Sequence, residues 1–122
     1  MKHKDNVITQ LDLIVDQVNS MKHSTENNIS NPMDIINFKD VLIKKLGNIF
    51  QQINTDSDMR YRVNILNSIQ LVINYVQSFN PTSSTLTIND VSSWLSSVAK
   101  RTDSISDLVG LEENDFSIAG KF

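Results

Sequence analysis

The 122-residue chain contains no cysteine, three glycines and two prolines. Without cysteine, a disulfide-stabilised scaffold and a cysteine-ligated zinc site are both excluded. All-β sandwiches and barrels need a turn about every ten residues, and turns consume glycine and proline. The scarcity of both residues therefore favours a few long elements joined by few loops.

The chain also lacks a long apolar run, since no segment approaches the roughly 20 apolar residues that a membrane-spanning helix needs. The most apolar part of the N-terminal region, residues 7–18, is interrupted by Asp and Gln and does not resemble the core of a signal peptide. We therefore expect no membrane contact and a cytoplasmic location, or one inside a host cell or particle. With 39% hydrophobic and 20% charged residues, the chain is too apolar to be disordered throughout.

Apolar residues recur at alternating intervals of three and four in four segments, which is the spacing of amphipathic helices. The segments run from Asp5 or Asn6 to about Met21, from Pro32 to about Ile53, from Asp58 or Met59 to about Phe79, and from the cap Thr87 to the residue before Gly110. The four predicted stripes are Val7, Leu11, Ile14, Val18 and Met21; Ile35, Phe38, Leu42, Leu46, Ile49 and Ile53; Ile65, Ile69, Val72, Val76 and Phe79; and Val91, Leu95, Val98, Thr102, Ile105 and Val109. The polar segment 22–31 is interpreted as a loop.

Local signals support these boundaries. Thr87 and Asp90 have the spacing of a capping box, in which each side chain pairs with the backbone of the other. Gly110 is suited to the left-handed conformation that often follows a helix, and Gly47 indicates either a tolerated glycine or a close approach of two helices. The wide apolar face of the third segment predicts the most buried helix, although residues 69–76 could also form a buried strand.

Together these features predict an all-α fold, a small bundle of about four amphipathic helices with heptad-like seams. We interpret residues 1–110 as a single helical domain and residues 111–122 as an acidic and apolar C-terminal tail. The helices are rich in Ser and Asn, which are weak helix formers, so their stability must come from burying the apolar stripes. This dependence on docking suggests that the chain binds a protein partner or copies of itself.

A non-enzymatic interaction module, such as an adaptor, an assembly factor or a small chaperone, is therefore the first functional hypothesis. The first and last helices would supply its contact surface, together with the tail, which could instead fold back over the bundle. Trp94 either completes the core or acts as an exposed anchor. The candidate partner-binding residues are Trp94, Leu95, Val98, Ile105, Phe116, Ile118 and Phe122.

A nucleic-acid-associated regulator is the alternative hypothesis. It requires six basic residues to converge on one surface, namely Lys44, Lys45, Arg60, Arg62, Lys100 and Arg101. The net charge of −3 argues against it, because neutralisation of phosphates supplies most non-specific affinity for nucleic acids. Scattered solubilising charges are the simpler interpretation.

No arrangement of residues in the sequence carries convincing chemistry. Ser97 and Lys100 match a Ser-x-x-Lys pattern, but the companion motifs of that chemistry are absent. The carboxylate pairs Asp12/Asp16, Asp103/Asp107 and Glu112/Glu113 are expected on polar faces or in the tail. The two histidines lack the helical spacing to acidic residues that a metal site in a bundle uses. We therefore expect no enzyme activity, cofactor, metal or small-molecule substrate.

Overall fold

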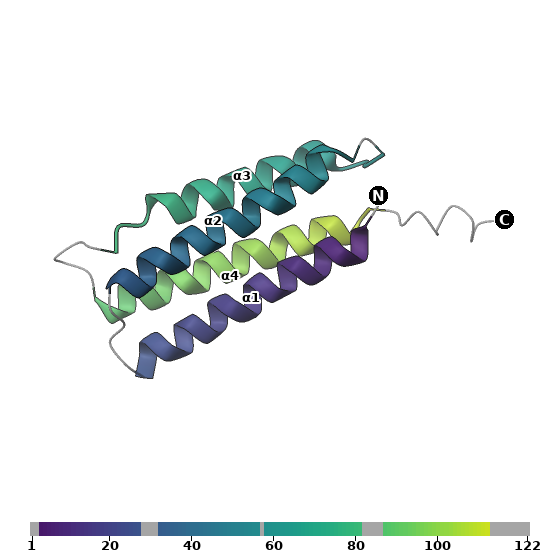
Figure 1. Cartoon of the computed structure of the whole chain (residues 1–122). Coiled ribbons are helices and arrows are strands. Elements are labelled where there is room, and N and C mark those ends of the chain that lie inside the picture. The colour runs from purple at the N-terminus through teal and green to yellow at the C-terminus, as the bar shows by residue number, and fades with distance from the viewer. Residues whose placement is uncertain (1–2, 28–31, 57, 82–86, 113–122) are drawn as a thin grey trace.

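The computed structural model describes residues 3–27, 32–56, 58–81 and 87–112. Within these ranges the chain forms four α-helices and no strand: α1 (Lys4–Asn27), α2 (Pro32–Asn54), α3 (Arg62–Ser78) and α4 (Ile88–Gly110). The helices lie side by side in a bundle (Figure 1). The prediction of a small all-α bundle is confirmed, and the strand alternative is excluded because residues 69–76 lie inside α3.

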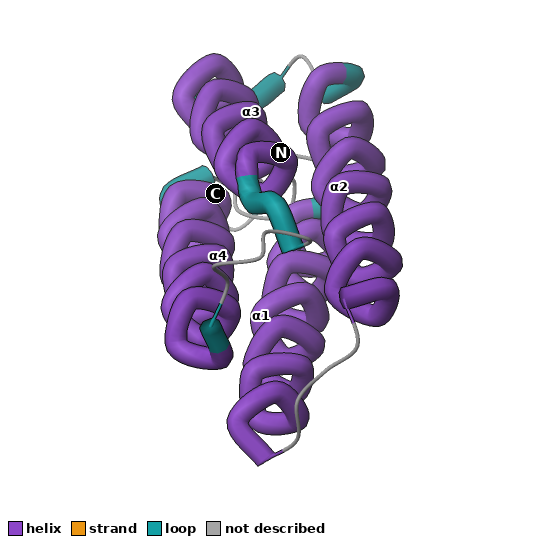
Figure 2. The backbone as a smooth tube through the Cα atoms, turned by 90° about the vertical axis from the view of Figure 1, so that its left-hand side faces the viewer, coloured by secondary structure: helices purple, strands orange, loops and turns teal. Residues whose placement is uncertain are grey.

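The helices do not pack against one another equally. α1 packs most extensively on α4, α2 packs on α3, and α3 makes a smaller contact with α4, whereas α1 and α2 touch least. Figure 2 shows α1 and α2 as neighbours whose axes diverge towards the end of α1. The bundle therefore consists of two tight pairs joined along α3 and α4, with a loose seam between α1 and α2.

The predicted stripes form the core. Every member is buried except Met21, Phe38 and Phe79, which are partly buried against the others. Even the one polar member, Thr102, is fully buried. Its hydroxyl remains hydrogen-bonded there, because it donates to the Val98 carbonyl oxygen at 2.8 Å. The stripes thus stabilise the bundle by burying apolar surface at roughly 25 cal/mol per Å².

Cations from neighbouring helices cap three helix C-termini. None of these helices has a basic residue in its own last turn. Arg62 donates to the Asn54 carbonyl oxygen at the end of α2, and Lys39 donates to those of Gln77 and Phe79 at the end of α3. Lys4 donates to the Gly110 carbonyl oxygen at the end of α4. These contacts satisfy terminal carbonyls and place positive charge at the negative ends of the helix dipoles.

α1 is longer than predicted, and the interpretation of residues 22–27 as loop is wrong. Thr25 is buried and its hydroxyl donates to the Met21 carbonyl oxygen. Glu26 lies 4.0 Å from Lys22 one turn earlier and accepts a hydrogen bond from Ser92 on α4. Contacts with α4 extend the helix through polar residues that the propensity argument assigned to a loop. Residues 28–31, which include the predicted cap Asn31, lie outside the described residues.

Two predicted helix ends are also wrong. α3 begins only at Arg62, because the Asp58 N–H is bonded to the Asp56 carboxylate and the Arg60 and Tyr61 N–H groups are bonded to the Glu112 carboxylate. Gly110 is the last residue of α4 and has no left-handed backbone; Leu111 follows it in the right-handed helical region. By contrast, the predicted capping box is confirmed, since Thr87 and Asp90 exchange side-chain-to-backbone bonds of 3.1 and 2.9 Å.

The most buried helix is α4 and not α3 as predicted. α3 leaves Val63 and Leu71 about two-thirds exposed, whereas α4 buries its stripe together with Trp94 and Ala99. The reason is the extent of the contacts: both helices touch two neighbours, but the contact of α4 with α1 is larger than either contact of α3. Gly47 marks no close approach of helices, since a Cβ atom built there would meet nothing within 4 Å.

Candidate functional site

The loose seam is formed by two stripes of residues that face each other across α1 and α2. The α1 stripe is polar except at Leu13 and consists of Gln10, Leu13, Gln17, Ser20 and Ser24. The α2 stripe consists of Asp34, Phe38, Val41, Lys45 and Asn48. Intervals of three and four residues keep each set on one face of its helix. Because the serines are small, the two helices do not fill the space between them.

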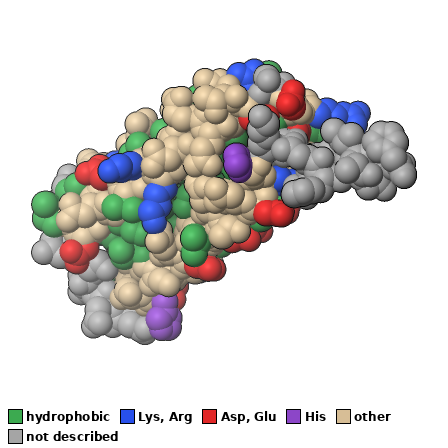
Figure 3. Space-filling view, turned by 45° about the vertical axis from the view of Figure 1, so that its right-hand side comes forward, with side chains coloured by type: hydrophobic (Ala, Val, Ile, Leu, Met, Phe, Trp, Pro, Cys, Tyr) green, Lys and Arg blue, Asp and Glu red, His purple; other side chains and the backbone are tan. Residues whose placement is uncertain are grey.

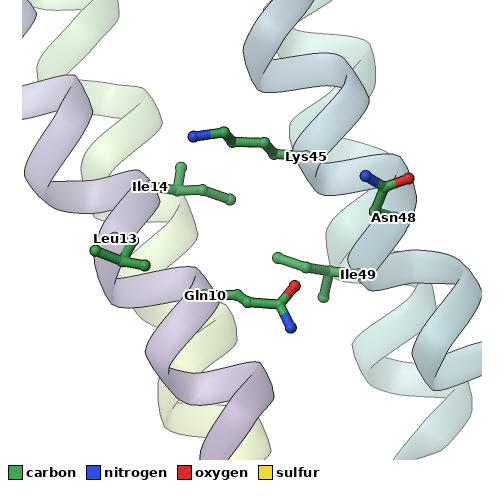
Figure 4. Close-up of a pocket in the computed structure, with 6 residues that line it drawn as sticks. All are labelled: Gln10, Leu13, Ile14, Lys45, Asn48 and Ile49. Atoms are coloured by element: carbon green, nitrogen blue, oxygen red, sulfur yellow. The ribbon is translucent and has the colours of Figure 1, made fainter.

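Two polar contacts hold one half of the seam together. Gln10 and Gln52 exchange amide hydrogen bonds of 3.2 and 3.1 Å, and the Lys45 ammonium donates to the Gln17 side-chain oxygen at 2.7 Å. Between these contacts lies a small cavity of about 170 Å³, lined by Gln10, Leu13, Ile14, Lys45, Asn48 and Ile49. Figure 4 shows Ile14 and Ile49 pointing into it from opposite helices, while Gln10 and Lys45 reach across.

Beyond Lys45 the seam opens into a surface groove, which we call the α1/α2 groove. It comprises two overlapping hollows of about 460 and 450 Å³ that share Met21, Ser24, Phe38 and Val41. Its full lining consists of Leu13, Asp16, Gln17, Ser20, Met21, Ser24, Asp34, Asn37, Phe38 and Val41. Its lining combines four apolar side chains, Leu13, Met21, Phe38 and Val41, with six polar or acidic ones. A mixture of apolar surface and a few polar groups is usual in a site that receives another molecule.

Two large apolar side chains of the groove are exposed to water. Leu13 on α1 is 53% exposed and Val41 on α2 is 44% exposed, so one stands on each wall. On the face that Figure 3 shows, hydrophobic side chains gather in the left half, with charged side chains around and among them. Isolated exposed apolar residues are common, but an apolar group lining a hollow is more informative.

Charged side chains of the groove are acidic. Asp16 on the α1 wall and Asp34 on the α2 wall are exposed, and the described lining contains no Lys or Arg. Of the nearby basic groups, Lys39 donates to the end of α3, whereas Lys45 borders the groove and donates to Gln17 of its lining. The groove thus presents an apolar surface between two carboxylates.

Four of the candidate partner-binding residues lie in the core. Trp94, Leu95, Val98 and Ile105 are all buried on α4, and the Trp94 ring stacks on Phe79 with centroids 4.3 Å apart. Trp94 therefore completes the core, which was one of its two interpretations. The other three candidates, Phe116, Ile118 and Phe122, lie outside the described residues.

Glu112 departs from its prediction as a polar-face or tail residue, because it is 3% exposed. Its carboxylate accepts hydrogen bonds from the backbone N–H groups of Arg60 and Tyr61, and its carbonyl oxygen accepts one from Lys4. Residue 112 therefore belongs to the packed bundle, although the sequence placed it in the tail.

The six basic residues of the alternative hypothesis are divided among different faces. Lys45 bonds to Gln17 across the α1–α2 seam, whereas the Arg101 guanidinium lies 4.3 Å from the Tyr75 ring on the α3–α4 side. Arg62 is bonded at the end of α2. Arg60 lies over the Tyr61 ring at 5.4 Å near the start of α3, and Lys44 and Lys100 are exposed on α2 and α4. The structure does not bring the six together.

The Ser97 and Lys100 pair shows no catalytic geometry in the described chain. The Ser97 hydroxyl accepts a hydrogen bond from Arg101 at 3.1 Å, and Lys100 is exposed. Asp12, Asp16, Asp103 and Asp107 are exposed on helix surfaces. Among the described residues, no three His, Asp or Glu side chains lie close enough to share a metal ion.

Sequence reasoning missed Leu13 and Val41, which fall outside the predicted stripes. The available signal was an apolar residue at helical spacing among polar ones, as in Gln10, Leu13 and Gln17. That signal does not specify a groove on its own, because Val63 and Leu71 show it too, and neither lines one of the hollows described above.

Comparison with protein-family models, curated proteins and solved structures produced no significant match. No helix of the described residues combines the length and apolarity needed to cross a bilayer. Function must therefore be inferred from the groove.

Proposed function

We propose that the chain is a non-enzymatic helical interaction module, an adaptor, assembly factor or small chaperone, that receives a protein segment in the α1/α2 groove. The observation that carries this proposal is the pair of exposed apolar side chains, Leu13 and Val41, on opposite walls of one hollow. An occupant that covered them would bury apolar surface on two helices at once.

The wall geometry favours a helical occupant. Both walls are α-helices, so their backbone N–H and C=O groups are paired internally and cannot bond an extended strand. A helix pairs its own backbone groups and brings only side chains to the groove. From Leu13 to Ser24 the α1 wall spans roughly 16 Å at 1.5 Å per residue, which matches about three turns of a docked helix.

Site-specific photo-crosslinking in the producing cell tests the proposal. A photoactivatable side chain at Val41 is expected to form an adduct with another protein, whereas the same group at Leu71 on α3 is not. Leu71 is a stringent control because it is more exposed, at 64% against 44%, so that non-specific capture would favour it. Leu13→Lys on the opposite wall should abolish the adduct from position 41.

Equal labelling at positions 41 and 71, or an adduct insensitive to Leu13→Lys, would contradict docking in the groove. An adduct of twice the mass of the chain would make the partner a second copy. Retention on a nucleic-acid column that falls steeply with salt would instead support the regulator hypothesis.

A further inference from the structure

We infer that the partner of the α1/α2 groove is a basic amphipathic helix, whose apolar row lies between flanking Lys or Arg side chains. This inference rests on the proposed function and specifies the chemistry of the occupant. It follows from the charges that face the groove and from the direction in which neighbouring charges point.

The two carboxylates stand on opposite walls of the groove, and each lines one of its two hollows. Asp16 stands on the α1 wall and Asp34 on the α2 wall, with Phe38 and Val41 between them in the lining. An occupant whose apolar residues cover Phe38 and Val41 would therefore place its flanking side chains near one Asp on each side. Cations at these positions would be attracted and anions repelled.

Other charges near the seam are directed to different neighbours. Asp12 accepts a hydrogen bond from Ser106 on α4, and Glu26 accepts one from Ser92 on the same helix. The Lys39 ammonium is bonded at the end of α3. Exposed Asp40 and Lys44 on α2 carry opposite charges and lie outside the lining. Lys22 is paired with Glu26, and Lys45 stands at the closed end of the groove, where it donates to Gln17. The charged side chains that line the open part of the groove are therefore Asp16 and Asp34.

The C-terminal tail and a second groove are poorer occupants. Residues 113–115 are Glu, Asn and Asp, so the start of the tail has the same sign of charge as the groove. Two copies meeting groove to groove would bring four carboxylates together. A basic helix removes this repulsion and completes the apolar contact.

Two designed helical peptides with the same row of leucines, one flanked by lysines and one by glutamates, provide the test. Each is titrated into the isotope-labelled full chain, and backbone amide chemical shifts report both affinity and position. The lysine-flanked peptide is expected to bind about five-fold more tightly at low salt, because two exposed ion pairs each add modestly. Its shifts should map to Leu13, Met21, Phe38 and Val41, and the preference should shrink in 0.5 M salt.

Charge reversal supplies the control. Asp16→Lys with Asp34→Lys should invert the preference, while Asp103→Lys with Asp107→Lys on the exposed face of α4 should leave it unchanged. The double variant Asp16→Asn, Asp34→Asn should abolish the preference for the lysine-flanked peptide. It replaces the charge-reversed variant if that variant fails to fold. All four positions are exposed, so the folded state should tolerate the changes.

The possible failures are distinguishable. Equal or tighter binding of the glutamate-flanked peptide in the groove would overturn the basic partner but leave the docking function standing. Shifts outside the groove, or none with either peptide, would also overturn this inference. The crosslinking experiment at Val41 separately decides the proposed function.

Discussion

Replacing Trp94 with alanine is expected to lower the free energy of unfolding by about 3–5 kcal/mol, the usual loss for a buried large aromatic side chain. Trp94 is 4% exposed, and its ring lies parallel to that of Phe79 with an interplanar angle of 8°. The pair joins α4 to the residue that follows α3. Loss of the Trp94 ring would remove both buried apolar surface and an aromatic stack.

Trp94→Phe is the matched control. The Trp94 Nε1 atom is buried without a hydrogen-bond partner in the described chain, so the indole N–H contributes no bond that phenylalanine would lose. Removing a buried, unpaired polar group is favourable and offsets part of the stability that is lost with the smaller ring. We therefore expect Trp94→Phe to lower the free energy of unfolding by about 1 kcal/mol. Urea unfolding followed by far-UV circular dichroism measures both variants. A Trp94→Ala protein as stable as the wild type would show that the ring is not part of the core.

Replacing Glu112 with alanine is expected to cost about 2–3 kcal/mol, because hydrogen bonds to a charged group are stronger than neutral ones and their donors would lose their partner. α3 begins at Arg62, and the side chain of its N-cap residue Tyr61 makes no capping bond. The Glu112 carboxylate supplies the cap from 51 residues away, accepting from the Arg60 N–H at 2.9 Å and from the Tyr61 N–H. Its negative charge also lies at the positive end of the α3 dipole.

Two variants separate the cap from the charge alone. Asp103→Ala removes an exposed carboxylate from α4 and should change stability by less than about 0.5 kcal/mol. Glu112→Gln keeps the volume and one acceptor and should fall between wild type and Glu112→Ala. Urea unfolding gives the three free energies, and amide hydrogen exchange at the start of α3 should accelerate in Glu112→Ala. A loss no greater than that of Asp103→Ala would contradict the capping role.

The fold could be predicted from the sequence wherever the signal was local. The stripes led by Val7, Ile35, Ile65 and Val91 alternate at helical spacing and are buried, and the capping box at Thr87 needs only residues within one turn. Such features depend on the neighbouring residues of the same helix and can therefore be recognised without a structure.

Features that depend on distant partners could not be predicted in this way. The last turn of α1 is stabilised by contact between Glu26 and Ser92, and Glu112 is buried because the backbone of residues 60 and 61 lies beside it. The groove depends on which helix pairs close tightly, since Leu13 would be covered if α1 packed on α2 as closely as it packs on α4. Amphipathic patterns show that helices have apolar faces but do not specify how large each interhelical contact will be.

Side-chain footprinting with a carbene reagent tests the central claim, that this protein meets its partner through the α1/α2 groove, most directly. The full chain would be labelled free and in the complex recovered from its cell. We expect Leu13 and Val41 to lose labelling in the complex while Val63 and Leu71 on α3 keep theirs. Protection at Val63 and Leu71 with unchanged labelling of Leu13 and Val41 would contradict the account.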